Sequence, residues 1–292
     1  MKPAPFAYHP VTTTAEATSL LAELAEGGRI LAGGQSLLPL MNFRLAQPEH
    51  LVDINPVEEL AYVRRGDGNV HVGALTRQAA VERSEEARRA TPLLVDALRY
   101  VAHPPIRHRG TVVGSIAHAD PAAELPAVAL ALGARITAAS SSGERSIEAD
   151  DFFLGPFETA LRPGELLTEV SFPVAAQGSG HGFSEFARRH GDFAIAGAAA
   201  VVELEGGRIR SARIALCGVG PCPLRASSAE ERLTGEVPDA EVIRAAADAA
   251  VEDLRPGQDI HGSSDYRVRV ARVQVRRAIS AAVERARGGN DS

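Results

Sequence analysis

Residues 110–124 read GTVVGSIAHADPAAE and combine glycines, small residues and β-branched residues. Thr111 and Ser115 place hydroxyl donors on either side of Gly114, and small residues let a backbone run close to a bulky ligand without a clash. We therefore expect a ligand-contacting loop here, followed by a helix that starts at Pro121. A tight strand that crosses a small-residue core explains the same composition, so the segment alone leaves both interpretations open.

A second glycine-rich segment, Ala32–Ser36 (AGGQS), directly follows a short apolar run that is typical of a buried strand. Adjacent glycines let backbone N–H groups point into a concavity that holds an anion, and Ser36 adds a hydroxyl. Neither G-x-G-x-x-G nor G-K-[ST] is present, which argues against a Rossmann fingerprint and a P-loop. An ordinary turn explains one such loop, whereas two make a single diphosphate ligand more plausible.

Composition bounds the class of protein. The chain has 292 residues, enough for two domains, and 45% of them are hydrophobic. With 31 Lys and Arg against 37 Asp and Glu, the net charge is −6, which argues against nucleic-acid binding. The 2 cysteines exclude a disulfide framework and cannot supply the four ligands of an iron–sulfur cluster. The N-terminus lacks a signal-peptide pattern and apolar runs are too short to cross a membrane, so we expect a cytoplasmic protein without a transmembrane segment.

The order of predicted elements is α+β followed by a second α+β unit, with a small, uncharged linker at residues 175–180. Thr13 and Glu16 predict a capping box at the start of the first helix. The pair Gly206–Gly207 predicts a β-hairpin. Its strands cover residues 194–205 and 208–217, and helices are expected at 226–233, 240–254 and 264–287, in addition to one at 92–102.

No residues stand out as catalytic or metal-binding groups. His103, His108 and His118 match no zinc spacing and have no cysteine nearby, so structural or surface roles are the better interpretation. His118 and Asp120 could form a catalytic pair, but no activated nucleophile motif accompanies them. The C-x-x-x-x-C spacing of Cys217 and Cys222 is not by itself a redox motif. We assign no catalytic residue and no metal ligand.

Four segments together carry a resemblance to a known family. They are LAGGQSLLPLMNFRLAQPEHLVDI (31–54), RHRGTVVGSIAHADPAAELP (107–126), FSEFARRHGDFAI (183–195) and QDIHGSSDY (258–266). In this order they resemble the FAD-binding medium subunit of molybdenum hydroxylases, the family of carbon monoxide dehydrogenase and xanthine dehydrogenase. The resemblance covers nearly the whole chain, which makes it far more specific than any single motif.

The resemblance implies a fold and two domains. Residues 1–175 would form an FAD-binding domain of the p-cresol methylhydroxylase/vanillyl-alcohol oxidase type (PCMH type), with α+β subdomains at about 1–56 and 57–175. Residues 176–292 would form the α+β C-terminal domain of the carbon monoxide dehydrogenase flavoprotein. By position, the two glycine-rich segments would hold the FAD diphosphate and the remaining family positions would contact the rest of the cofactor. The implied FAD-binding residues are Ala32, Gly33, Gly34, Gln35, Ser36, Val101, Thr111, Val112, Val113, Gly114, Ser115, Glu124, Leu167, Asp192 and Phe193.

Three of these positions depart from the family pattern. Val113 stands where the family commonly has glycine, and a β-branched residue cannot adopt a positive φ cheaply. Glu124 replaces the usual Asp, which keeps the charge and lengthens the reach. Phe193 stands where Tyr is frequent in the family, so the aromatic ring is kept and the hydroxyl group is lost. Of the three, Val113 is the one that could weaken FAD binding.

The implied function is electron transfer inside a larger enzyme. A large molybdopterin subunit would oxidise the substrate, and a small subunit with two [2Fe–2S] clusters would relay electrons to FAD on this chain, in a dimer of heterotrimers. FAD would pass them to NAD⁺, a quinone or O₂. A self-sufficient FAD-dependent oxidase or reductase is the alternative from another class, because the same FAD-binding fold hosts such enzymes. A scaffold that has lost FAD is a third option, supported only by Val113.

Overall fold

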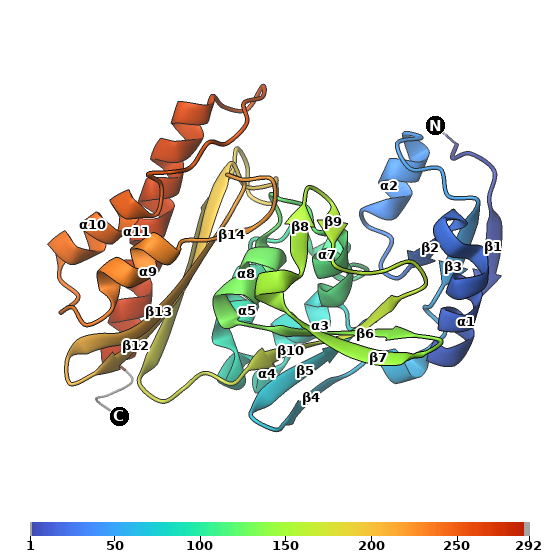
Figure 1. Ribbon diagram of the computed structural model, residues 1–292, viewed down its shortest axis with the longest axis horizontal. Helices are drawn as coiled ribbons and strands as arrows, with labels where there is room; N and C mark the ends of the chain where they lie inside the picture. The colour runs from blue at the N-terminus through green and yellow to red at the C-terminus, as the bar shows by residue number, and fades with distance from the viewer. Residues whose placement is uncertain (1, 289–292) are drawn as a thin grey trace.

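The computed structural model describes residues 2–288 and contains three layered α/β regions (Figure 1). The first sheet is parallel, with β3 (His50–Asp53) between β1 (Ala7–Pro10) and β2 (Gly28–Leu31). Helix α1 (Thr14–Leu24) packs on it. The Thr13 half of the predicted capping box is confirmed, since Thr13 Oγ1 accepts the Glu16 N–H at 3.1 Å. The Glu16 carboxylate accepts the Thr12 N–H at 2.8 Å in place of the Thr13 N–H. Helix α2 (Leu37–Asn42) follows β2.

The second sheet is antiparallel with the order β4-β5-β10-β6-β7, and short helices cover it (Figure 1). A two-stranded ribbon, β8–β9, projects beside the end of α7. The strands are β4 (Val63–Gly66), β5 (Asn69–Gly73), β6 (Arg135–Ser140), β7 (Gly143–Glu148), β8 (Phe153–Gly155), β9 (Glu158–Thr159) and β10 (Leu166–Pro173). The helices are α3 (Gln78–Arg83), α4 (Glu85–Ala90), α5 (Pro92–Leu98), α6 (Pro104–Arg107), α7 (Val112–His118) and α8 (Glu124–Leu132), with 3-10 turns at Ala25–Gly27, Glu58–Leu60 and Ala149–Asp151.

The third sheet has the order β11-β12-β13-β14 and carries three helices on one face (Figure 1). The predicted hairpin is confirmed, and its turn residues Gly206 and Gly207 have φ of 57° and 79°, which only glycine adopts easily. Helix α11 lies directly on β11. The two backbones are so close at Gly180 that a Cβ there would come 2.0 Å from the Ala282 carbonyl oxygen. The elements are β11 (Ser179–Phe186), β12 (Ala196–Glu205), β13 (Arg208–Cys217), β14 (Leu224–Arg225), α9 (Ser227–Leu233), α10 (Ala240–Ala249) and α11 (Ser264–Gly288).

Several sequence predictions were wrong in detail. The loop predicted over residues 110–120 contains helix α7, because Thr111 Oγ1 accepts the Gly114 N–H at 3.0 Å and Val112, Val113 and Ile116 bury one face. The helix expected from Pro121 begins only at Glu124. The helix expected over 240–254 ends at Ala249, and strands β1 and β4 were not predicted.

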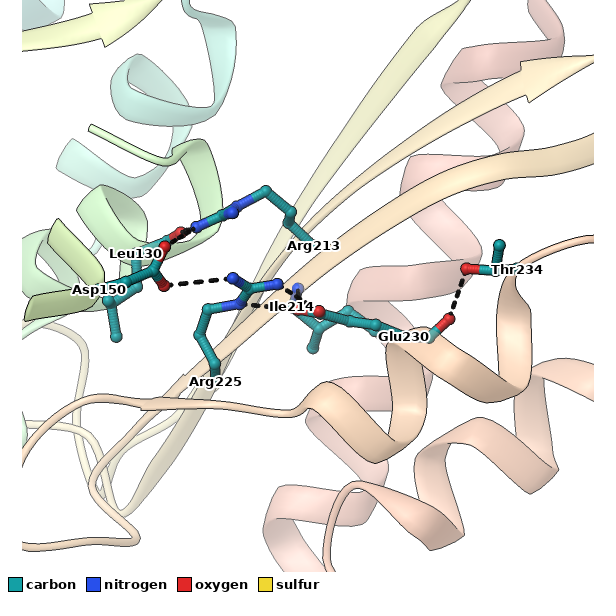
Figure 2. A network of polar contacts seen from close by, with 7 residues as sticks. All are labelled: Leu130, Asp150, Arg213, Ile214, Arg225, Glu230 and Thr234. Carbon is teal, nitrogen blue, oxygen red and sulfur yellow. Dashed lines mark hydrogen bonds and ion pairs between the residues drawn. The ribbon is translucent and has the colours of Figure 1, made fainter. Parts of the chain in front are cut away.

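The free face of the third sheet packs on α8, so α8 lies between the elements of the second sheet and the third sheet. A polar network joins the same two layers (Figure 2). Arg213 donates to the Leu130 carbonyl at 2.8 Å and to Asp150 at 2.9 Å, and Arg225 reaches the other Asp150 oxygen at 3.2 Å. Burial raises the pKa of Asp150, but these two guanidinium groups outweigh it and lower the pKa overall. Glu230 pairs with Arg225 and accepts the Ile214 N–H at 2.8 Å.

Candidate functional site

The two glycine-rich segments lie against each other. A Cβ on Gly33 would come 2.6 Å from the Arg109 carbonyl oxygen, 2.7 Å from Gly110 Cα and 3.1 Å from Thr111 N. Only glycine permits this backbone-to-backbone approach. The structure thus brings together two loops that sequence reasoning connected only through a shared ligand.

Two side chains that the sequence analysis missed tie these loops together. Arg77 donates to the Arg109 carbonyl at 2.6 Å and to Asn55 Oδ1 at 2.6 Å. Asn55 in turn donates to the Ala32 carbonyl at 2.9 Å. Asn55 comes shortly after β3, and Ala32–Ser36 comes directly after β2. Because β2 and β3 are neighbouring parallel strands, their carboxyl ends lie at the same edge of the sheet, which places Asn55 beside Ala32–Ser36. The sequence signal for Asn55 was its place directly after the apolar run HLVDI (50–54), which is typical of a buried strand. No sequence signal pointed to Arg77.

The junction of the loops is cationic. Burial, followed by the nearby charge of Arg109, lowers the pKa of Arg77, so the two guanidinium groups lie close enough to repel. The nearby negative charge of Asp53 acts in the opposite direction and raises the pKa of Arg77. Burial alone would raise the pKa of Asp53, but hydrogen bonds from Tyr8 and Asn55 lower it overall, which keeps it ionised. Two cations face one carboxylate, and a bound diphosphate would relieve the repulsion.

The second segment presents its hydroxyl groups from the first turns of α7. Thr111 is used internally as the cap, and a Cβ on Gly114 would come 2.5 Å from its Oγ1. Among residues 2–288, the hydroxyl groups of Ser36 and Ser115 form no hydrogen bond. Val113 is 2% exposed and is not among the residues with positive φ. The concern about a β-branched residue at this position is therefore removed, because its backbone is right-handed helix.

A second group of predicted residues lies around the turn at Gly191. Gly191 has φ of 87°, and a Cβ there would come 2.7 Å from His103 Cε1 and 2.9 Å from the Ala102 carbonyl oxygen. The turn before Phe193 therefore rests on the residues that follow Val101. Asp192 is exposed and Phe193 is 62% exposed, so its ring is free to stack on a flat ligand.

Leu167 and Glu124 complete the set of predicted residues. Leu167 is buried on β10, which packs against α7. Glu124 is the first residue of α8 and is 4% exposed. Burial raises its pKa to about 7. Its charge also acts on Glu185 and Cys217 of the third sheet, so Glu124 lies at the boundary with that sheet.

Metal-binding clusters and membrane-spanning helices are both absent from the part of the chain that the structure describes. Over residues 2–288 there is no group of three or more His, Cys, Asp or Glu side chains that could hold a metal ion. Within the same range no helix is long and apolar enough to cross a membrane.

Comparison with known families decides which protein class this arrangement belongs to. Residues 4–175 match the family described as the FAD binding domain in molybdopterin dehydrogenase. The chain belongs to the FAD-binding medium subunits of molybdenum hydroxylases. Residues 181–282 match the CO dehydrogenase flavoprotein C-terminal domain, which confirms the predicted fold class and FAD as the cofactor.

Relatives of this medium subunit cover its full length. It is 45% identical to the 6-hydroxypseudooxynicotine dehydrogenase complex subunit alpha of Paenarthrobacter nicotinovorans, over 100% of this chain and 99% of the relative. It is 39% identical to the carbon monoxide dehydrogenase medium chain of Hydrogenophaga pseudoflava, over 97% and 98%. A solved carbon monoxide dehydrogenase structure from the same organism superposes with a TM-score of 0.96 at 40% identity, covering 98% of this chain and 99% of that chain.

Proposed function

We propose that this medium subunit holds the FAD diphosphate at the junction of Ala32–Ser36 and Thr111–Ser115. The backbone contact of Gly33 with Arg109–Thr111 carries this proposal, because it makes one cradle from two loops. Arg77 and Arg109 supply the positive charge that two phosphate groups need. The free hydroxyl groups of Ser36 and Ser115 supply further donors.

The remaining residues would orient the ring system. Phe193 would stack on the isoalloxazine, with Asp192 and Val101 beside it and Leu167 contributing from β10. Glu124 would reach the cofactor from the start of α8. FAD supplies the redox chemistry when it is bound, and the chain binds, orients and shields it. No side chain is proposed as catalytic.

We further propose the domain limits of 1–175 and 176–292, with subdomains at about 1–56 and 57–175. They are supported by the two family matches, of which the first ends at residue 175 and the second begins at residue 181. Strand β11 starts between these positions, at Ser179. A cytoplasmic location is proposed from the two free cysteines, Cys217 and Cys222.

The partners would be a small subunit that carries two [2Fe–2S] clusters and a large subunit that carries the molybdenum cofactor, in a dimer of heterotrimers. Electrons would enter from the small subunit and leave FAD for NAD⁺, a quinone or O₂.

We propose that the small subunit docks on the β8–β9 ribbon. Leu154 and Phe157 are 60% and 59% exposed there, and Phe157 is fixed to α7, with its ring 5.1 Å from that of His118. This apolar pair lies beside the C-terminal end of α7, the helix that carries some of the proposed FAD contacts, and exposed apolar residues of this kind are typical of partner interfaces.

The double variant Leu154→Asp/Phe157→Asp is expected to reduce capture of the small subunit at least tenfold, because two carboxylates would be buried without partners. The measurement is the iron content that co-purifies with a tagged chain expressed together with its partner subunits. Val237→Asp, at a site 47% exposed on the α9–α10 connection, is the matched control and should leave capture unchanged. Equal capture by both variants, with FAD bound in each, would rule out this docking face.

A further inference from the structure

Segment 258–266, one of the four that carry the family resemblance, forms the turn that leads into helix α11. Asp259 Oδ1 accepts the N–H groups of His261 at 2.8 Å and of Gly262 at 3.2 Å. The backbones of Asp259 and Gly262 also bond to each other. These backbone donors, followed by Arg267, hold the pKa of the Asp259 carboxyl below its usual range, so the group is ionised at neutral pH. The turn therefore holds one carboxylate in a fixed place.

This carboxylate pairs with a guanidinium group that is largely buried. Arg267, in the first turn of α11, donates from Nη2 to Asp259 Oδ2 at 2.8 Å, and its side chain is only 11% exposed. Nη1 of the same group donates to the Ile195 carbonyl at 2.9 Å and to the Gly218 carbonyl at 3.0 Å. A planar guanidinium group can bind three such acceptors at once, which a lysine ammonium on a flexible stem does not reproduce.

The two carbonyl groups belong to segments that meet at one end of the third sheet. Ile195 directly precedes β12, and Gly218 directly follows β13. Gly218 has φ of 78°, and a Cβ there would come 2.7 Å from the Ala194 carbonyl oxygen and 2.9 Å from that of Ile195. The Gly218 N–H donates to the Pro121 carbonyl at 2.8 Å, in the connection between α7 and α8. Arg267 therefore binds the backbone at the place where the third sheet meets this connection.

The Ile195 carbonyl lies two residues after Phe193, whose ring is exposed. The Ile195 N–H donates to the Phe186 carbonyl at 2.8 Å, which closes the turn between β11 and β12. Ala194 and Ile195 are both buried, so the backbone is held there while the neighbouring ring projects outward. The direction of the ring thus depends on where this short stretch of backbone is fixed.

Segment 258–266 also contacts the start of the same turn. The rings of Phe186 and Tyr266 meet edge to face, with centroids 6.5 Å apart. Arg188 donates to His261 Nδ1 at 3.2 Å. Together with Arg267, the segment therefore contacts the turn at its start and at its end.

We propose that Arg267, held by Asp259, is a positioning residue that fixes the turn bearing Phe193 and so sets the place of its ring on the flavin. The inference rests on the proposed stacking of Phe193 on the isoalloxazine. Without the guanidinium group, the carbonyls of Ile195 and Gly218 lose their shared donor and the Asp259 carboxylate loses its cation. The turn then gains freedom, and FAD binding must supply the cost of ordering it.

The first test is a double-mutant cycle on the FAD affinity of the full chain. Arg267→Met and Phe193→Ala should each weaken binding about tenfold, and the double variant should lose little more than either change alone, because Arg267 acts through the ring. Arg267→Lys should recover little of the loss. Asp259→Asn, a milder change that keeps the oxygen bonded to the backbone, should weaken binding about threefold. Losses that multiply in the double variant would overturn the positioning role.

The matched control is Arg269→Met, since Arg269 is exposed on the same helix. Its FAD affinity should stay within about twofold of the wild type, because a surface substitution away from the turn changes little. A loss equal to that of Arg267→Met would show that any cation removed from α11 weakens binding, and would contradict the role of Arg267.

Hydrogen exchange without cofactor reads the turn itself. The peptide that covers residues 187–195 should exchange at least about tenfold faster in Arg267→Met than in the wild type or Arg269→Met, whereas β10 should be unchanged. Unchanged exchange of 187–195 in a folded Arg267→Met chain would refute the positioning role. Faster exchange together with a Phe193→Ala chain that binds FAD like the wild type would refute the proposed stacking, and with it the link to the flavin. A wild-type chain that binds no FAD refutes the proposed function, and the exchange rates still decide whether Arg267 fixes the turn.

Discussion

Gly33→Ala is expected to weaken FAD binding about a hundredfold, which corresponds to about 2.7 kcal/mol. The new Cβ would come 2.6 Å from the Arg109 carbonyl oxygen and 2.7 Å from Gly110 Cα, and both are backbone atoms that no side-chain rotation can move. One of the two loops must therefore shift, and a cradle assembled from both loses its geometry. The measurement is the dissociation constant for FAD, from the change of flavin absorbance on binding.

The matched control is Gly257→Ala. A Cβ at Gly257 would meet no atom within 4 Å, so the same chemical change there should leave FAD affinity within twofold of the wild type. Circular dichroism at the working temperature confirms that both variants are folded. A Gly33→Ala chain that is folded and binds FAD like the wild type would remove the two-loop cradle as the binding site.

Arg77→Met is the second change with a large expected effect, a loss of about thirtyfold in FAD affinity. It removes a cation from the junction and the two hydrogen bonds of 2.6 Å that join the Arg109 carbonyl to Asn55. Methionine retains the length and apolar stem of the side chain. We expect Arg77→Lys to recover little of the loss, because one ammonium group cannot reproduce the planar, two-sided contact of a guanidinium group.

The same experiment has an electrostatic readout. Removing one cation should make FAD affinity less sensitive to salt, since fewer charges are screened. Arg65→Met is the control, because Arg65 is exposed on β4 and makes no ion pair within residues 2–288. An affinity loss that is equal for Arg65 and Arg77 would show that general charge, and not the junction, governs binding.

The sequence predicted the parts of this site that rest on local patterns. The strand before Ala32, the cap at Thr13 and the turn at Gly206–Gly207 were all found, because their causes lie within a few neighbouring residues. The position of Ala32–Ser36 against Thr111 was inferred only through a ligand that both could share. The contact itself joins Gly33 to residues 109–111, more than 70 positions away along the chain, and no local pattern records such an approach.

Two kinds of information were out of reach. Arg77 sits at the start of an amphipathic helix, where an arginine is ordinarily a solvated residue, so nothing singled out its contacts with Asn55 and Arg109. Helix α7 was missed because Gly114 and two adjacent valines have weak helix propensity, and the cap at Thr111 together with burial outweighs it. The same error produced the unnecessary concern over Val113.

The most direct test of the diphosphate cradle is a titration of the purified chain with FAD, followed by competition with ADP and with riboflavin. We expect a flavin absorption band at about 450 nm that saturates at about one FAD per chain. ADP, which carries the diphosphate, should displace it, whereas riboflavin, which lacks any phosphate, should not at the same concentration. Displacement by riboflavin as effective as by ADP would contradict a cofactor held at the junction of Gly33 and Thr111.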